Sequence, residues 1–238
     1  MTRPTALIVA APGTNRDRDV ATALDLAGAD PRTVLVDELL DRPRVLDDAQ
    51  LVIVPGGFSH ADALGAGRMF ALTLALRVGD QLRDFVDSGR PVIGICNGFQ
   101  TLVRAGLLPG ALGHNESGEF QCEWVTLDPQ PSRCIWTRDL APFDCPIAHG
   151  EGRYVHPDVA ALDAAGQVAL RYRTNPNGSI DSIAGVCDGS GLVLGLMPHP
   201  ENHILRRQHP HARRGSTGEL GLRLFEQGVR HAAELVRC

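Results

Sequence analysis

Short apolar runs alternate with amphipathic stretches along the first hundred residues. The runs at 5–11 (TALIVAA), 33–39 (TVLVDEL), 51–57 (LVIVPGG) and 91–95 (PVIGI) have the length and β-branched content of buried strands. Between and after them, apolar residues recur at helical spacing. This alternation predicts an α/β fold, with a doubly wound and largely parallel sheet.

The expected helices share apolar positions three and four residues apart, with glycine near their ends. They cover 19–29, 67–88 with a bend near Gly79, 98–106, and about 218–236. The second half of the chain is different, because 118–128 and 132–137 have the pattern of adjacent antiparallel strands. Further strand-like segments follow at 145–154, 167–173, 182–188 and 191–201. The stretch 129–132 resembles a domain boundary, but a turn explains it equally well, so we expect one domain over 1–238.

Composition and charge exclude several classes of function. The net charge of −5 argues against a general nucleic-acid-binding surface. No apolar stretch approaches the roughly 20 residues of a membrane helix. The apolar run near the start is followed by Pro12-Gly13 and has no cleavage site, so it is expected to be a strand and not a signal peptide. We therefore expect a cytoplasmic protein.

The six cysteines are widely scattered and form no C-x-x-C pair, so no metal site is expected. Cys96 differs from the others in its context. It lies between a predicted strand and a predicted helix, with Gly94 and Gly98 on either side. A nucleophile on a sharp strand-to-helix turn needs small neighbours, and a helix N-terminus favours a negatively charged sulfur. The alternative is a buried cysteine at a strand end.

A cysteine nucleophile needs a base and a group that orients the base. His199 follows the apolar segment 192–197, and Glu201 stands two residues later, on the same side of an extended chain. Glu201 is expected to hold His199 in the tautomer that accepts a proton from Cys96. Both chain segments end at the carboxyl edge of the predicted sheet, where such folds place their chemistry. The alternative is a solvated proline-rich turn.

Gly56-Gly57 follows the third strand and lets the backbone approach a ligand. The N–H groups of Gly57 and Asn97 are expected to form an oxyanion hole for a tetrahedral acyl intermediate. A simple glycine-rich turn is the alternative.

The segments VPGG (54–57), GICNGFQ (94–100) and MPHPE (197–201), in this order, resemble the class I, or triad-type, glutamine amidotransferases. Within that class, the segments APGTNRD (11–17), HGEGRY (149–154) and NPNGS (175–179) are similar to the glutaminase subunits of phosphoribosylformylglycinamidine synthase. The similarity covers almost the whole chain. It implies a three-layer fold with a flavodoxin-like core, a mostly parallel central sheet, flanking helices and a small antiparallel addition.

The resemblance also implies roles for residues. Cys96 would attack the side-chain amide of glutamine to give a γ-glutamyl thioester and ammonia, with His199 and Glu201 completing the triad. The residues expected around the glutamine are Gln100, His149, Gly150, Glu151 and Gly152. The ammonia would pass to a synthetase subunit that makes formylglycinamidine ribonucleotide with ATP, in purine biosynthesis. A small accessory subunit is a further expected partner.

The resemblance implies no cofactor in this chain, with ATP and Mg on the synthetase partner, and the sequence contains no G-x-x-x-x-G-K-[ST] loop. Two positions depart from the family pattern. Arg16 stands where the family commonly has cysteine, and His60-Ala61 replaces an expected Tyr-Gly. The basic segment 206–215 is interpreted as a solvated loop in preference to a partner contact.

Three other interpretations remain open at this point. The chain is alternatively a glutaminase subunit of another biosynthetic amidotransferase. It is also alternatively a hydrolase or isomerase of the same superfamily, with its cysteine nucleophile on the same strand-to-helix turn. It is also conceivable as a non-catalytic binding subunit, which the intact Cys96, His199 and Glu201 argue against.

Overall fold

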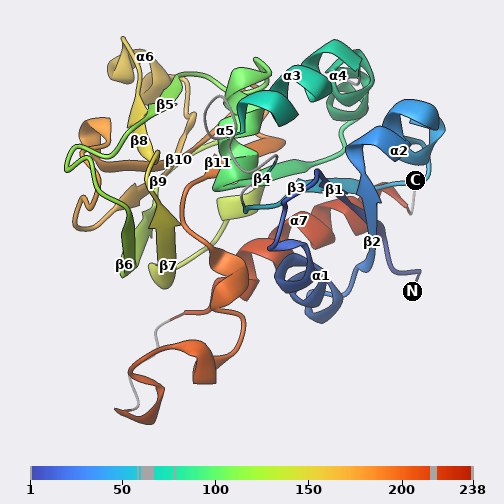
Figure 1. The fold of residues 1–238 in the computed structure, drawn as a ribbon. Coiled ribbons are helices and arrows are strands. Elements are labelled where there is room, and N and C mark those ends of the chain that lie inside the picture. The colour runs from blue at the N-terminus through green and yellow to red at the C-terminus, as the bar shows by residue number, and fades with distance from the viewer. Residues whose placement is uncertain (1, 58, 60–66, 78, 215–218, 237–238) are drawn as a thin grey trace.

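A nine-stranded sheet forms the centre of the molecule in this computed structural model, which describes residues 2–57, 59, 67–77, 79–214 and 219–236. The strand order is β2-β1-β3-β4-β11-β10-β9-β6-β7, and β5 and β8 form a separate two-stranded sheet. Helices cover both faces of the nine-stranded sheet (Figure 1). The predicted α/β fold, with a mostly parallel central sheet and flanking helices, is confirmed.

Five neighbouring strands make up the parallel part of the sheet. They are β2 (Asp30–Leu35), β1 (Thr5–Ala10), β3 (Leu51–Val54), β4 (Val92–Ile95) and β11 (Val193–Leu196). Strands β3, β4 and β11 are buried at every position because helices cover both faces, as is usual for parallel strands. The carboxyl ends of these central strands meet at one edge of the sheet.

The remaining strands are antiparallel and extend the sheet from β11. They are β10 (Ile183–Cys187), β9 (Val168–Tyr172), β6 (Gln121–Pro129) and β7 (Phe143–His149). Strand β7 alternates strictly between buried and half-buried positions, so one of its faces packs on the interior. The small sheet pairs β5 (Ala111–Gly113) with β8 (Arg153–Val155), and the sequence analysis did not predict β5.

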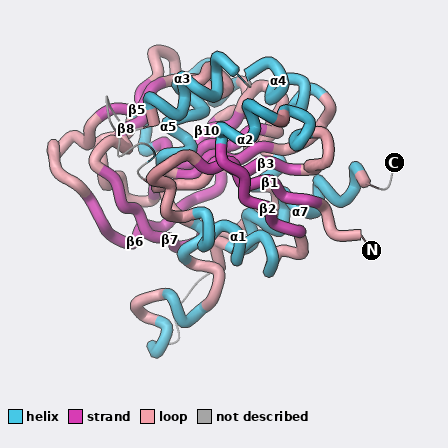
Figure 2. The backbone as a smooth tube through the Cα atoms, turned by 45° about the vertical axis from the view of Figure 1, so that its right-hand side comes forward, coloured by secondary structure: helices cyan, strands magenta, loops and turns pink. Residues whose placement is uncertain are grey.

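The helices divide between the two faces of the sheet. Helices α3 (Arg68–Arg77), α4 (Gly79–Asp87) and α5 (Asn97–Arg104) lie on one face, and α1 (Asp17–Leu26) and α7 (Leu222–Leu235) lie on the other (Figures 1 and 2). Helix α3 ends at Arg77 and α4 begins at Gly79, and residue 78, where the bend expected near Gly79 would fall, lies outside the described residues. Two short helices, α2 (Val36–Asp41) and α6 (Val159–Ala164), complete the set of α-helices in the described residues.

One predicted strand is wrong, and another ends earlier than predicted. Residues 132–137 do not form a strand, because Ile135–Thr137 is a short 3₁₀ helix. The ring of Trp136 is fully buried there, and its indole N–H donates to Leu192 O at 2.9 Å, so a tertiary contact overrides the local pattern. The strand expected at 33–39 ends at Leu35, and helix α2 follows because Val36 and Leu39, three residues apart, are buried on one face.

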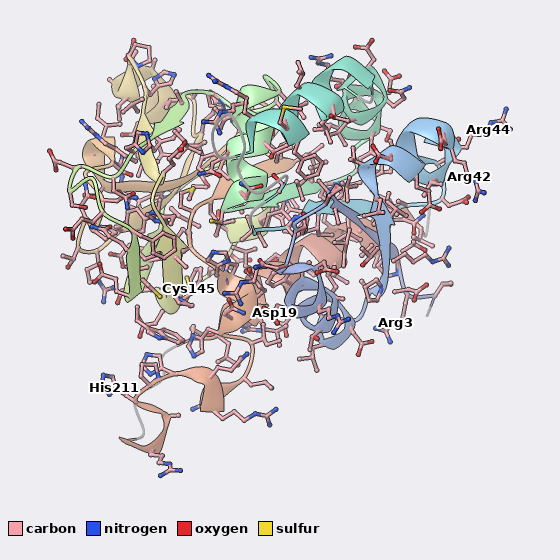
Figure 3. All side chains as sticks on the ribbon, in the orientation of Figure 1. Arg3, Asp19, Arg42, Arg44, Cys145 and His211 are labelled. Atoms are coloured by element: carbon pink, nitrogen blue, oxygen red, sulfur yellow. The ribbon has the colours of Figure 1, made fainter. Side chains whose placement is uncertain are left out.

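Residues 204–214 form an arm that projects from the body of the molecule and carries His211 (Figures 1 and 3). The side chains of Arg206, Arg207 and Arg213 are exposed, as expected for a solvated loop. His209 is buried instead, with its ring 4.6 Å from that of Trp124 between centroids. The base of the arm is therefore packed against β6.

Candidate active site

Cys96 occupies the corner between β4 and α5. Its backbone has φ 50° and ψ −106°, a conformation rare for any residue with a side chain. Two hydrogen bonds hold this corner: Cys96 N donates to Leu196 O at 2.8 Å, and Gln100 N donates to Cys96 O at 3.1 Å. Strained backbone of this kind is concentrated at functional sites. The thiol is therefore presented on a sharp turn and is not packed within the strand.

Gly98 makes this turn possible by its close contact with β3. A Cβ at Gly98 would lie 1.9 Å from the carbonyl oxygen of Val54, which no side chain tolerates. We expect Gly98→Ala to lower the free energy of unfolding by about 3 kcal/mol and to displace Cys96. Gly113→Ala is the matched control, because a Cβ there meets nothing within 4 Å. Denaturant melts of the two variants test this, and a wild-type midpoint for Gly98→Ala would contradict it.

His199 and Glu201 form a buried ion pair behind Cys96. The distance from His199 Nδ1 to Glu201 Oε1 is 2.7 Å, and the exposed fractions of the two side chains are 4% and 0%. His199 follows β11, and its backbone N–H donates to Pro146 O of β7 at 2.8 Å. The pair is thus fixed between the parallel and antiparallel parts of the sheet. Because Nδ1 faces the carboxylate, Nε2 is left to face Cys96.

The pKa of His199 is raised to about 10 by its neighbours. Burial alone lowers the pKa, but charge interactions with Glu201 and Cys96, together with hydrogen bonds to both side chains, raise it by more. His199 therefore carries a proton at neutral pH. His199 was expected to accept the proton of Cys96, and the raised pKa of His199 favours the protonated imidazole that this transfer produces.

Gly57 and Asn97 line the same cavity as Cys96. Gly57 has φ 128°, and a Cβ there would lie 2.7 Å from the backbone nitrogen of Asn15. Asn97 is the first residue of α5, and its buried side chain accepts a hydrogen bond from Ser59 Oγ at 2.5 Å. Gly57 therefore borders the cavity from a glycine turn and Asn97 from a helix N-terminus, and the oxyanion hole stays a prediction.

The segment 149–152 closes the site from the side of β7. Gln100 Nε2 donates to Glu151 O at 2.5 Å, and Arg104 is 3.4 Å from the Glu151 carboxylate. The Gln100 side chain also accepts from Asn97 Nδ2 at 3.1 Å. Gln100 was predicted to contact the substrate. In the structure its buried side chain lines the cavity and also links α5 to this segment, and its contact with glutamine stays a prediction.

His149 forms part of the wall beside His199. Its Nδ1 is 3.0 Å from Asn115 Oδ1, and its Nε2 is buried without a hydrogen-bond partner among the described residues. Burial, and secondly the charge of His199, lowers the pKa of His149 to about 4. Gly152 packs on the ring, since a Cβ there would lie 2.2 Å from His149 Cε1. His149 is therefore a neutral imidazole at physiological pH.

A cavity of about 350 Å³ opens onto these residues. It is lined by eight of the ten residues predicted for the site: Gly57, Cys96, Asn97, Gln100, His149, Gly150, Glu151 and His199. Glu201 lies behind His199, and Gly152 lies against the ring of His149. The structure thus brings all ten predicted residues to one place.

The sequence analysis missed several residues of this wall. Asn15, His114, Phe120 and Ala148 line the cavity, and so does Arg16, which was noted only as a departure from the family pattern. Arg16 pairs with Asp19 at 3.1 Å. The glycine turn before Asn15 was a usable signal, but nothing local marks His114 or Phe120. The other departure, His60-Ala61, lies outside the described residues.

Within the described part of the chain, no group of three or more histidine, cysteine, aspartate or glutamate side chains is arranged to hold a metal ion. The described residues likewise contain no helix that is long and apolar enough to cross a membrane.

The fold and the arrangement of Cys96, His199 and Glu201 agree with the protein family that the sequence matches. The family of CobB/CobQ-like glutamine amidotransferase domains matches residues 3–232, so the chain belongs to this family.

Two similar proteins with curated names and one solved structure indicate a particular member of this family. A protein of Treponema denticola named phosphoribosylformylglycinamidine synthase subunit PurQ is 42% identical, over 96% of this chain and 99% of its own length. A protein of Dehalococcoides mccartyi with the same name is 38% identical, over 99% of this chain and 100% of its own. The solved structure of PurLQS from Thermotoga maritima contains a chain with TM-score 0.81 and 37% identity, over 96% of this chain and 99% of that one.

Proposed function

We propose that this chain is the glutaminase subunit of phosphoribosylformylglycinamidine synthase, which acts in purine biosynthesis. The observation that carries the proposal is the Cys96–His199–Glu201 arrangement at the mouth of a cavity, in a chain of this family with PurQ relatives along almost its whole length. The described residues share one hydrophobic core, which supports a single functional domain over 1–238.

The chemistry follows from the site. The sulfur of Cys96 attacks the γ-carbon of glutamine, and the oxyanion that forms is stabilised by the N–H groups of Gly57 and Asn97. The carbon–nitrogen bond breaks, and the nitrogen leaves as ammonia with the proton held by His199. Water then attacks the thioester and gives up a proton to His199, which restores the Cys96–His199 pair and releases glutamate. Glu201 keeps the imidazole oriented throughout.

The ammonia is used by a partner subunit. PurLQS of T. maritima is an assembly with a chain similar to this one, and this supports a synthetase subunit as the partner here. ATP and Mg are proposed to act on that synthetase subunit, and a small accessory subunit to complete the complex. The site of action is proposed to be the cytoplasm, the compartment of soluble purine biosynthesis.

Two other functions are separable from this one. A glutaminase subunit of another biosynthetic amidotransferase would respond to a different synthetase. A free-standing cysteine hydrolase would need no synthetase. The identities of about 40% to relatives named PurQ favour the proposed function over both.

The test is the rate of glutamine hydrolysis with and without the synthetase subunit. Gly57 adjoins a glycine turn, and a peptide flip there moves an oxyanion-hole donor at low steric cost. Loss of one such donor costs about 2.7–4 kcal/mol of transition-state stabilisation. We therefore expect low hydrolysis by the chain alone and about 100-fold more when the synthetase and its nucleotide substrates bind. An isolated chain at full rate, unchanged by the synthetase, would indicate a free-standing hydrolase.

A further inference from the structure

His149 lines the cavity, and one of its ring nitrogens is a hydrogen-bond acceptor without a partner among the described residues. This acceptor is Nε2 of His149, and its chemical state follows from Asn115. Asn115 Nδ2 donates to two carbonyl oxygens, those of Glu119 and His149, both at 2.8 Å. The orientation of the Asn115 amide is therefore fixed, with Nδ2 as the donor and Oδ1 as the acceptor.

The fixed amide decides the tautomer of His149. Asn115 Oδ1 accepts the backbone N–H of Gly152 at 3.1 Å and lies 3.0 Å from His149 Nδ1. An amide oxygen offers no proton, so Nδ1 must carry the hydrogen. In a neutral imidazole the other nitrogen then has a lone pair, which makes Nε2 an obligatory acceptor.

Burying this acceptor costs free energy unless a hydrogen-bond donor contacts it. His149 is only 3% exposed, and its Nε2 has no hydrogen-bond partner among the described residues. His149 also lines the cavity together with Cys96 and His199. The low pKa of His149, about 4, keeps the ring neutral at physiological pH, so Nε2 stays an acceptor.

We propose that His149 Nε2 accepts a hydrogen bond from the γ-amide N–H₂ of glutamine. This contact selects an amide over an ester or a carboxylate. Asn115 positions the ring and fixes its tautomer. This inference rests on the proposed glutaminase function and assigns the amide group its partner. When Cys96 attacks the γ-carbon, the amide nitrogen is the adjacent atom that carries hydrogens. One N–H on His149 orients the nitrogen lone pair toward the proton on His199.

The same contact acts against the product. The γ-carboxylate of glutamate has no hydrogen to donate at neutral pH, so it would face the lone pair of Nε2 with its own lone pairs. A site whose buried polar group is satisfied by one substrate disfavours the analogue that lacks the matching group. His149 therefore binds the amide reactant in preference to the carboxylate product.

The test compares two substrates that give the same γ-glutamyl thioester. Glutamine has amide hydrogens, and the γ-methyl ester of glutamate has none. The ratio of their kcat/KM values is measured for the wild-type chain in its complex with the synthetase subunit, and for His149→Leu and His149→Gln. We expect His149→Leu to lower the ratio of glutamine to ester about tenfold, the usual effect of one hydrogen bond. His149→Gln keeps an acceptor and should restore much of the ratio.

The outcomes are distinguishable. A wild-type complex that hydrolyses neither substrate overturns the proposed function itself. A wild-type complex that hydrolyses glutamine, together with a His149→Leu complex that loses both substrates in equal proportion, overturns only the role of His149.

A second measurement does not depend on activity. In Cys96→Ala protein labelled with ¹⁵N-histidine, added glutamine should shift the Nε2 resonance of His149, which is assigned by its loss in His149→Gln. Glutamate should not shift it. Equal shifts with both ligands would contradict the proposal.

Discussion

Replacement of Cys96 with alanine is expected to abolish glutamine-dependent activity while the protein still folds. Loss of a catalytic nucleophile of this type costs about 10⁴-fold or more in rate. The strained φ of 50° is as accessible to alanine as to cysteine, since both have a Cβ, and Cys96 contributes little to the core beyond its sulfur. The measurement is steady-state glutamine hydrolysis by the complex, with thermal unfolding as the check on folding.

Two controls accompany this prediction. Cys122→Ala removes an exposed thiol and should leave the rate unchanged. In the complex, Cys96→Ala should still support amidine formation from added ammonium salt, because the synthetase reaction is intact. A glutamine analogue with an α-diazoketone should label Cys96 in preference to the other five cysteines. Substantial glutaminase activity in folded Cys96→Ala would remove Cys96 from the mechanism.

His199→Ala is expected to lower kcat by about 10²–10⁴-fold, the usual contribution of a proton-transfer group. Glu201→Gln should cost less, because the amide still holds the ring at Nδ1. It should, however, move the pH profile. The Glu201 carboxylate raises the pKa of His199, so the wild-type rate should persist as pH rises and fall only near pH 10. In Glu201→Gln the alkaline limb should lie at lower pH.

The same raised pKa has a consequence for stability. A group whose pKa is higher in the folded state contributes stability below its unfolded pKa, about 6.5 for histidine, and loses it as pH rises through the folded value. The His199–Glu201 pair should therefore stabilise the wild type at pH 7 and less above pH 10.

If Glu201→Gln reduced kcat more than His199→Ala did, the roles of the two residues would have to be exchanged.

Local patterns in the sequence were sufficient to predict the strand-to-helix turn at Cys96 and the strands beside it. The buried strands β3 and β4 are short β-branched runs, and glycine on both sides of Cys96 marks the turn, so the corner could be predicted from adjacent residues. The fold class followed from the alternation of elements. These features depend on interactions within about ten residues, which a local pattern records.

Features that depend on distant contacts could not be predicted in this way. Asn115 reaches His149 across the small β5–β8 region, and no local pattern marks it as the residue that sets the tautomer. Trp136 is buried against Leu192 and holds its segment as a 3₁₀ helix, although the local residues resemble a strand. His199 N pairs with Pro146 O only because β7 lies beside the end of β11 in space.

The central claim is that this chain supplies glutamine nitrogen to a synthetase, and the most direct measurement follows that nitrogen. The complete complex is given glutamine labelled with ¹⁵N in the amide, together with ATP, formylglycinamide ribonucleotide and unlabelled ammonium. We expect ¹⁵N in the amidine group of the product with the wild-type chain, and only unlabelled nitrogen with Cys96→Ala. Amidine formed at the same rate and with the same unlabelled nitrogen by both proteins would contradict the claim.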